Sequence, residues 1–241
     1  MNLRDSGFGC NPEKQSIGGN VKNIFFIAVL FFPGLVTAQE RVVPADQEPL
    51  HKMELKNDYI EVLHVTMPPG QSTLLHTHSH DRTAVVLSNS TMKEDILGKE
   101  QNRARAANAG SVSPQENVMQ PFTHRLKNIG TKPFEVLDIE LLKRPDGPAT
   151  EPIGIPASES SSFRTYRWTI APGNSAPEHT HLRPYLIIAA TPMQLLMKSP
   201  GGGSMEHPVK AGDFHWVDSK VTHTLINNGK EPGTIVEVEI R

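Results

Sequence analysis

Two groups of histidines in this sequence have the spacing of transition-metal ligands. In each group two histidines flank a single residue and a third lies in a later segment: His76, His78 and His124, and then His179, His181 and His223. Alternate side chains of a β-strand point to one face, so each His-x-His pair presents both imidazoles on the same side. Three neutral imidazoles suit Fe, Mn, Cu, Ni or Zn and leave positions open for water or substrate. We therefore predict a divalent transition metal as cofactor, with these six histidines as ligands.

The segments that position these histidines occur twice. Val65–Gly70 and Trp168–Gly173 each end in Pro-Gly, and in both copies five residues separate that glycine from the first histidine. Each copy closes with an alternating run, Phe134–Glu140 in the first and Thr234–Ile240 in the second. The segments between are short and β-branched, are separated by turn residues and lack a useful helical period. The duplication predicts an all-β chain of two tandem antiparallel barrels.

Composition limits the classes of function. The chain has 241 residues, of which 37% are hydrophobic and 21% charged, as expected of a soluble protein with a sizeable core. Its formal net charge of -2 leaves no basic excess for a phosphate backbone, so we expect no nucleic-acid partner. Nothing in the sequence resembles a Gly-x-Ser-x-Gly nucleophile elbow. We expect a small-molecule substrate or ligand, and a monomer or a homodimer.

Residues 1–38 are interpreted as a secretory signal peptide with an atypical N-terminal extension. Ile24–Val36 is an apolar run too short to span a bilayer comfortably, and Val36-Thr37-Ala38 matches a small-residue cleavage site. A buried strand or an uncleaved anchor is the alternative, and the extension suggests that translation starts at Val21. Cleavage would remove Cys10, the only cysteine. The mature chain is then expected to be secreted or periplasmic and free of the membrane.

The rest of the chain divides at a segment rich in proline and serine. We predict one domain at residues 48–143, a linker at residues 144–161 and a second domain at residues 162–241. Each domain then carries one complete group of three histidines.

The order of these motifs resembles a known superfamily. A glycine, five residues, His-x-His and a later glycine leading to His-x-x-x-Asn resemble the two signature motifs of the cupins, and the duplication resembles a bicupin. The resemblance covers Leu50–Leu142 and Ser162–Arg241. It implies two jelly-roll barrels, each with a metal site in its mouth, in an exported metal-dependent enzyme. Dioxygenase-type oxidoreductase chemistry is the first choice, and isomerase or lyase chemistry is also compatible. The alternative is a non-catalytic barrel that binds a small molecule or a metal.

One departure from the cupin pattern concerns a glutamate ligand shortly after the second histidine. The positions where the cupin pattern has this glutamate hold Arg82 and Thr83 in the first copy and Tyr185 and Leu186 in the second. Each site is therefore expected to be a three-histidine site or to have lost its metal. An inward Arg82 would disfavour a cation, so metal is expected first in the second barrel.

Three other side chains near the motifs are candidates for supporting roles. Tyr185 could be a weak ligand, a proton donor or a core aromatic, and His215 could face the second cavity. These two residues are our candidates for catalytic groups. His80 could substitute for a ligand or support one.

Overall fold

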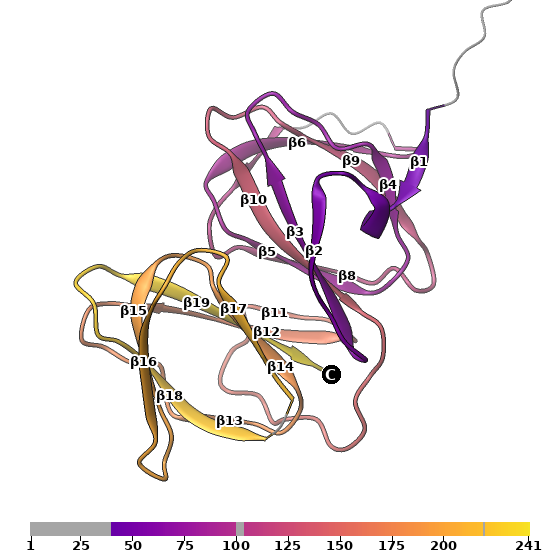
Figure 1. Cartoon of the computed structure of the whole chain (residues 1–241). Coiled ribbons are helices and arrows are strands. Elements are labelled where there is room, and N and C mark those ends of the chain that lie inside the picture. The colour runs from indigo at the N-terminus through magenta and orange to yellow at the C-terminus, as the bar shows by residue number, and fades with distance from the viewer. Residues whose placement is uncertain (1–39, 100–103, 219) are drawn as a thin grey trace, which may run out of the picture. The chain divides into compact units, whose positions relative to one another are not determined.

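The computed structural model describes residues 40–99, 104–218 and 220–241, which form two β-barrels, each made of two facing sheets. The predicted all-β architecture of two tandem jelly-roll barrels is confirmed (Figure 1). The predicted signal peptide and Cys10 lie outside the described residues. Within those residues the helical structure is one 3-10 turn, η1 (Ala45–Gln47). The histidines therefore have to be positioned by strands.

Barrel 1 pairs a sheet of order β1-β4-β9-β6-β7 with a sheet of order β2-β3-β10-β5-β8. Its strands are β1 (Val42–Pro44), β2 (His51–Lys56), β3 (Ile60–Met67), β4 (Leu75–His78), β5 (Arg82–Val86), β6 (Ser90–Ile96), β7 (Ala104–Ala107), β8 (Val112–Gln115), β9 (Phe122–Asn128) and β10 (Phe134–Leu141). All neighbours are antiparallel except β1, which lies parallel to the histidine-bearing strand β4. The short strand β1 thus covers an edge that would otherwise leave β4 unpaired on one side.

Barrel 2 repeats this layout with sheets of order β11-β12-β19-β14-β17 and β13-β18-β15-β16. Its strands are β11 (Ser158–Glu159), β12 (Phe163–Ile170), β13 (His179–His181), β14 (Tyr185–Ala189), β15 (Met193–Lys198), β16 (Ser204–Val209), β17 (Phe214–Val217), β18 (Val221–Asn227) and β19 (Gly233–Ile240). The strand β13, which carries the His-x-His pair, therefore corresponds to β4 of barrel 1.

The closing strand of each barrel is buried on both faces. In β19, Val236 and Val238 belong to an apolar core that side chains of both barrels share, whereas Glu237 and Glu239 face the histidines of barrel 2. The corresponding strand β10 has the same arrangement, with Leu137 and neighbouring apolar residues in the shared core. Because strand side chains alternate, one strand can join the barrels and also supply acids to a site.

The asparagine that ends the second motif has a structural role. Asn128 donates from its amide nitrogen to the carbonyl oxygens of Met67 and Lys132, and its own side-chain oxygen accepts from the backbone N–H of Gly130. Asn227 makes the corresponding three contacts in barrel 2. The residue satisfies buried backbone groups where the strand leaves the sheet. It does not contact the histidine groups.

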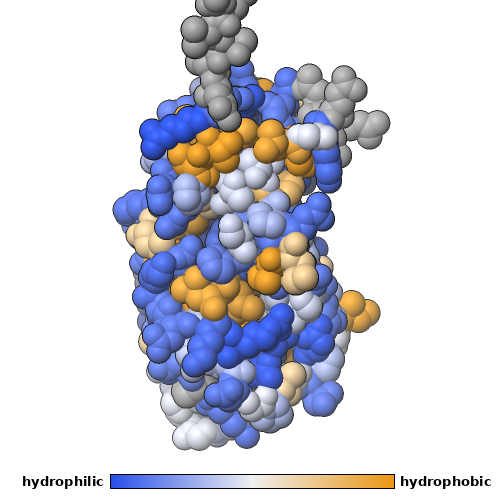
Figure 2. Space-filling view, turned by 90° about the vertical axis from the view of Figure 1, so that its right-hand side faces the viewer, coloured by the Kyte–Doolittle hydropathy of each residue, from blue (hydrophilic) through white to orange (hydrophobic). Residues whose placement is uncertain are grey.

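The surface is mixed. Figure 2 shows a largely hydrophilic face on which apolar side chains form separate patches. In the part of the chain that the structure describes, no helix has the length and apolarity needed to cross a membrane.

Candidate metal centre

Barrel 2 brings its three motif histidines to one point. His179 and His181 lie on β13, and His223 on β18 is the cross-strand partner of His179. The Nε2 atoms of His179 and His223 are 2.8 Å apart, and all three rings are buried. Metal–nitrogen bonds of about 2.0–2.1 Å place neighbouring ligand atoms about 3 Å apart, so this spacing suits ligands that share one ion.

A carboxylate completes the group in barrel 2. The oxygens of Glu237, which is fully buried, lie 3.0 Å from Nε2 of His179, 2.9 Å from Nε2 of His223 and 3.4 Å from Nε2 of His181. Trp168 donates its indole N–H to the same carboxylate at 2.6 Å. The structure here differs from the expected three-histidine site, because the glutamate comes from the last strand and not from the segment after the second histidine.

The outer nitrogen, Nδ1, of each barrel 2 histidine has a neighbouring polar or polarisable group. The partners are the Pro177 carbonyl for His179 (2.7 Å), the Glu239 carboxylate for His181 (2.9 Å), and both the Tyr185 hydroxyl (3.4 Å) and the Met197 sulfur (3.3 Å) for His223. Partners at Nδ1 fix the orientation of a ligating ring and leave Nε2 for the metal.

The acids of barrel 2 govern its electrostatics. Burial acts to raise the pKa of Glu237, but the three surrounding histidines hold that pKa well below its usual value. Burial acts to lower the pKa of His181, but Glu237 and Glu239 outweigh it and raise the pKa to about 9. Burial, with Glu237, raises the pKa of Tyr185, so its hydroxyl stays protonated. The acids thus favour positive charge at this centre, which the proton of His181 supplies when no metal is bound.

Barrel 1 repeats the three histidines without the carboxylate. His76 and His78 on β4 face His124 on β9, and their ligand atoms lie within 4.8 Å of one another. The Nε2 atoms of His78 and His124 are 3.2 Å apart. The groups that hold Nδ1 are the Leu74 carbonyl for His76 (2.9 Å), Glu140 for His78 (2.5 Å) and Glu94 for His124 (2.7 Å). The rings are therefore oriented as in barrel 2.

Asp138 has the strand position in barrel 1 that Glu237 has in barrel 2, but it pairs with Arg82. Nη1 of Arg82 donates to Oδ1 of Asp138, and Nε donates to Oε1 of Gln115 at 2.7 Å. The side chains of Arg82 and Asp138 are each 7% exposed. The carboxylate that could have joined the histidines is thus engaged by a guanidinium, which does point into the barrel.

This guanidinium gives barrel 1 the opposite electrostatic character. Burial lowers the pKa of His78 and His124, and the charge of Arg82 lowers both further, although Glu94 opposes the shift at His124. Burial, together with neighbouring imidazoles, lowers the pKa of His76 to about 2. The three rings are therefore held neutral, which is the state that binds a metal, but without an anionic ligand beside them.

His80 lies outside the histidine group of barrel 1. Its Nδ1 donates to Oε2 of Glu140 at 3.0 Å, and its side chain is 44% exposed. Glu140 thus contacts both His78 and His80. Glu61 completes a third cluster with His80 and Glu140, but Lys56 already pairs with Glu61 at 2.7 Å. His80 supports the orientation of His78 through Glu140 and is not a direct member of the group.

The two predicted catalytic residues of barrel 2 lie in different environments. Tyr185 is buried at the centre, with its ring stacked on His181 at 3.9 Å between centroids. His215 is exposed and lines an apolar cavity of about 410 Å³. The structure therefore brings Tyr185 to the histidines, whereas His215 lies at the cavity wall.

Sequence reasoning missed the acids and the residues that orient them. Glu237, Trp168 and Asp138 were not predicted as site residues, and His51, which was given no role, is buried with its ring 4.6 Å from that of His76. A usable signal existed in the last strand of each barrel. Acids that alternate with Val, Ile or Leu in a strand buried on both faces must point into the protein.

The residues of both barrels fit a divalent transition metal. Among the described residues, Nε2 of His76, Nε2 of His181 and Oε1 of Glu237 are buried without a hydrogen-bond partner. Buried polar atoms are normally satisfied, so convergent orphan atoms of these types indicate ligands. Three imidazoles with one carboxylate in barrel 2, and three imidazoles in barrel 1, suit Fe, Mn, Cu, Ni or Zn.

This chain resembles known proteins in structure. No protein-family model matches the sequence, and neither does any curated protein. AerE from Microcystis aeruginosa matches 80% of this chain and 98% of its own, with a TM-score of 0.54 and 15% identity.

Two enzymes also share the fold. Salicylate 1,2-dioxygenase from Pseudaminobacter salicylatoxidans has a TM-score of 0.50 at 11% identity, with 76% of this chain and 71% of its own covered. Oxalate decarboxylase has a TM-score of 0.50 at 12% identity, with 78% and 74% covered. At these identities the likeness shows the fold alone, which is the pair of tandem jelly-roll barrels that the repeated His-x-His motifs predict.

Proposed function

We propose that this bicupin is an exported metal-dependent enzyme that acts on a small molecule in barrel 2, with dioxygenase-type oxidation as its reaction class. The observation that carries the proposal is the convergence of three buried Nε2 atoms and the Glu237 carboxylate on one point. A structural site closes all positions around its ion, whereas four ligands leave positions open on a metal that prefers six.

The residues that would hold the metal are the three histidines and Glu237. A divalent transition metal bound there would polarise a bound substrate or dioxygen, as a Lewis acid or a redox centre. The protein's own contribution is to keep Glu237 ionised and to fix the imidazoles. Trp168 donates to the carboxylate from one side, which limits its rotation away from the histidines.

An apolar chamber lies beside this group in barrel 2. The cavity of about 410 Å³ is lined by Ile187, Leu195 and Ile235, among others. Ile235 precedes Glu237 by two residues on the same face of β19, and Met197 lines the cavity while its sulfur lies 3.3 Å from Nδ1 of His223. Such walls would bind the body of an apolar small molecule and exclude water from its reacting end.

Two polar groups are placed to handle protons. Tyr185 keeps its proton because its pKa is raised, so it can donate a hydrogen bond but is a poor base. His215 and His207 line the cavity where it meets solvent. In the proposed enzyme Tyr185 steadies the ring of His223, while His215 or His207 exchanges protons with a bound substrate.

Support for the reaction class comes from the fold. Structural neighbours include a salicylate dioxygenase and an oxalate decarboxylase, so oxidation with dioxygen is our first choice and lyase chemistry our second. Barrels of this kind host several chemistries, and the site decides among them. The apolar chamber favours a substrate with an aromatic or aliphatic body.

Metal analysis combined with oxygen uptake tests the proposal. Protein purified without chelator or histidine tag should contain a redox metal such as Fe, Mn or Cu, and should consume dioxygen with phenolic or aromatic-acid substrates. His223→Asn should abolish turnover, whereas the matched His124→Asn variant in barrel 1 should retain it. A folded wild-type protein that binds small molecules but holds no metal would overturn the enzyme and favour a binding module.

Export is tested separately. When the chain is expressed in a secreting host, we expect the mature protein outside the cytoplasm, with its N-terminus at Gln39. An uncleaved, membrane-attached chain would contradict this part of the proposal.

A further inference from the structure

Barrel 1 contains a cavity lined by two arginines, whereas neither arginine nor lysine is among the residues that line the cavity of barrel 2. The cavity has a volume of about 270 Å³, and Arg82, Arg105, Asp138 and His124 line it. Arg105 lies on β7, which pairs with β6. At the corresponding position on β16, which pairs with β15, the cavity of barrel 2 has His207. A cavity of this size that contains two guanidinium groups is suited to a small anion.

Arg82 is the buried cation of this cavity. Its Nε and Nη1 are committed to Gln115 and Asp138, and among the described residues Nη2 makes no hydrogen bond. The whole residue is only 6% exposed. A guanidinium has five N–H donors in a planar fork, so a ligand oxygen can bind at Nη2 while the pair with Asp138 stays intact.

The acids near the cavity are already engaged. Asp138 accepts from Arg82, and Glu94 contacts both Arg105 at 3.3 Å and Nδ1 of His124 at 2.7 Å. These bonds leave the open donor of Arg82 as the group that an incoming ligand meets. The cavity therefore has a place for an anion in spite of its two neighbouring carboxylates.

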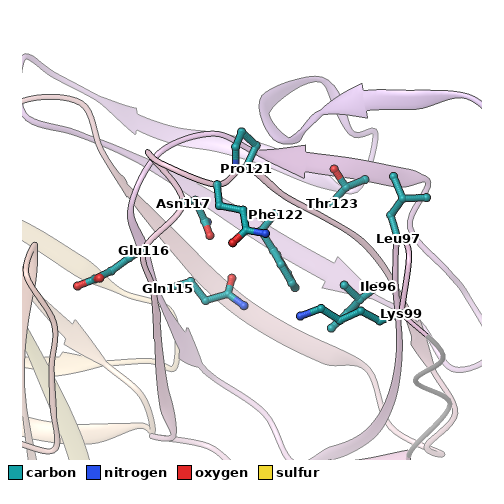
Figure 3. Close-up of a pocket in the computed structure, with 10 residues that line it drawn as sticks. Ile96, Leu97, Lys99, Gln115, Glu116, Asn117, Pro121, Phe122 and Thr123 are labelled. Carbon is teal, nitrogen blue, oxygen red and sulfur yellow. The ribbon is translucent and has the colours of Figure 1, made fainter.

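A second cavity shares the lining residue Gln115 with the first one. This cavity has a volume of about 320 Å³. Figure 3 shows Gln115 and Phe122 beside it, and the amine of Lys99 pointing toward it. Gln115 lines both cavities, and the guanidinium carbon of Arg82 lies 6.0 Å from the centre of the Phe122 ring. Lys99 and Glu116 both line this second cavity, so it contains one charge of each sign.

The histidines of barrel 1 lack what this anion would bring. In barrel 2 the three imidazoles have the carboxylate of Glu237 beside them, but in barrel 1 Arg82 draws the corresponding carboxylate of Asp138 away. A divalent cation held by three neutral imidazoles would retain its full charge next to a guanidinium. An external carboxylate between the two cations would restore the charge balance of barrel 2.

We propose that barrel 1 binds a small organic carboxylate through Arg82, and that this anion takes the place at His76, His78 and His124 that Glu237 has in barrel 2. Carboxylate and metal then bind barrel 1 cooperatively, since each improves the site for the other. The inference goes beyond the proposed enzyme of barrel 2 and depends only on the capacity of the histidines of barrel 1 to hold a metal.

Zinc titrations of the chelator-treated full chain test the proposal. Affinities are measured in a carboxylate-free buffer with acetate or malonate added, with acetamide or malonamide as neutral controls, and with allowance for zinc complexes in solution. One of the two zinc sites should gain about tenfold or more in affinity with the carboxylates and nothing with the amides. His124→Asn should remove the responsive site, and His223→Asn should leave it.

Arginine variants assign the effect. Arg82→Gln combined with Asp138→Asn removes both charges of the pair and should abolish the gain, whereas Arg125→Gln, which alters an arginine paired with Asp95 outside the cavity, should keep it. If the double variant does not fold, Arg82→Lys provides the test, because it keeps a charge for Asp138 but loses the fork. It should lose most of the gain.

Three outcomes would overturn the proposal: no gain at either site, an equal gain at both, or a gain that survives loss of the guanidinium. The proposed enzyme is judged by metal and turnover in barrel 2, so either idea can fail while the other holds.

Discussion

Barrels 1 and 2 orient their histidines alike but surround them with different charges. Both place a His-x-His strand against a third histidine, and both hold Nδ1 of the first histidine with the carbonyl two residues earlier and Nδ1 of the second with a glutamate from the last strand. The barrels differ at four corresponding positions around the histidines. Barrel 1 has Arg82, Asp138, Glu94 and Val65 where barrel 2 has Tyr185, Glu237, Met197 and Trp168, in that order. Ring geometry and electrostatic character are thus set by separate positions.

The two arrangements distribute buried charge differently. In barrel 1 the guanidinium and the carboxylate of Asp138 satisfy each other, and such a pair is costly to break because either partner alone is a buried, uncompensated charge. In barrel 2 Glu237 has only imidazoles and the indole N–H of Trp168 around it. Without metal, barrel 2 therefore takes its positive charge from the proton of His181, whereas barrel 1 contains the permanent charge of Arg82.

Removing the carboxylate of barrel 2 should have the largest effect. Glu237→Gln keeps the shape but loses the negative charge, so we expect metal affinity of barrel 2 to fall about 100-fold or more, with loss of turnover. Competition titrations with a chelator and elemental analysis measure this. The matched change in barrel 1, Asp138→Asn with Arg82→Gln, should leave the metal of barrel 2 in place. Retention of full affinity in Glu237→Gln would show that the acid is not a ligand.

Giving barrel 1 the residues of barrel 2 should transfer part of that affinity. The double variant Arg82→Tyr with Asp138→Glu removes the buried cation and lengthens the acid, and we expect about 10-fold tighter metal binding in barrel 1. The gain should stay below the affinity of barrel 2, because Val65 supplies no counterpart to the N–H of Trp168. Unchanged affinity in a folded variant would contradict the electrostatic account.

The barrels should also respond to pH in opposite directions when metal has been removed. His181 has a folded-state pKa of about 9, above its usual 6.5, so its stabilisation is present below pH 6.5 and is lost as pH rises toward 9. His76 has a folded-state pKa of about 2, so stability falls as pH drops below 6.5, where the unfolded chain takes up the proton. At about 1.4 kcal/mol per pH unit, we expect a loss of about 3 kcal/mol for His181 between pH 6.5 and about 9, and about 3 kcal/mol for His76 between pH 6.5 and about 4.5.

Urea unfolding of chelator-treated protein, repeated from acid to alkaline pH, measures how the free energy of unfolding changes with pH. His181→Asn should reduce the loss of stability at alkaline pH, and His76→Asn should reduce the loss at acid pH. A profile that neither variant alters would rule out these groups as the source.

The fold could be predicted from the sequence because it depends on repeated local signals. Paired Pro-Gly turns, β-branched segments and the two His-x-His motifs specify strands and a duplication without any knowledge of distant contacts. The two alternating runs that close the copies are strands β10 and β19 of the structure.

The chemistry of the sites was harder to predict because it depends on pairings between distant strands. Glu237 joins its histidines from the last strand, and only the sheet register shows which acid of Thr234–Ile240 meets them. The sequence could suggest that Arg82 opposes a cation, but its partner Asp138 lies 56 residues away. Long-range ion pairs of this kind leave no local pattern.

A smaller effect is expected from the indole that holds Glu237. Trp168→Phe keeps an aromatic ring beside His179 but loses the N–H donor, so metal affinity of barrel 2 should fall about 10-fold. Trp216→Phe is the matched control, since Trp216 packs on the shared core and stacks with Tyr59. That variant should change stability only. Equal loss of affinity in both variants would point to packing rather than to the hydrogen bond.

The smallest effect should come from the hydroxyl of Tyr185. Its oxygen lies 3.4 Å from Nδ1 of His223, a long contact that the sulfur of Met197 shares, so the ring keeps one neighbour when the hydroxyl is lost. Tyr185→Phe preserves the stacking on His181, and we expect about 1 kcal/mol or less in stability and a change of about threefold in metal affinity. Chelator competition and turnover measured together decide its role: if turnover falls far more than affinity, Tyr185 acts on substrate, and if both change equally, it only positions His223.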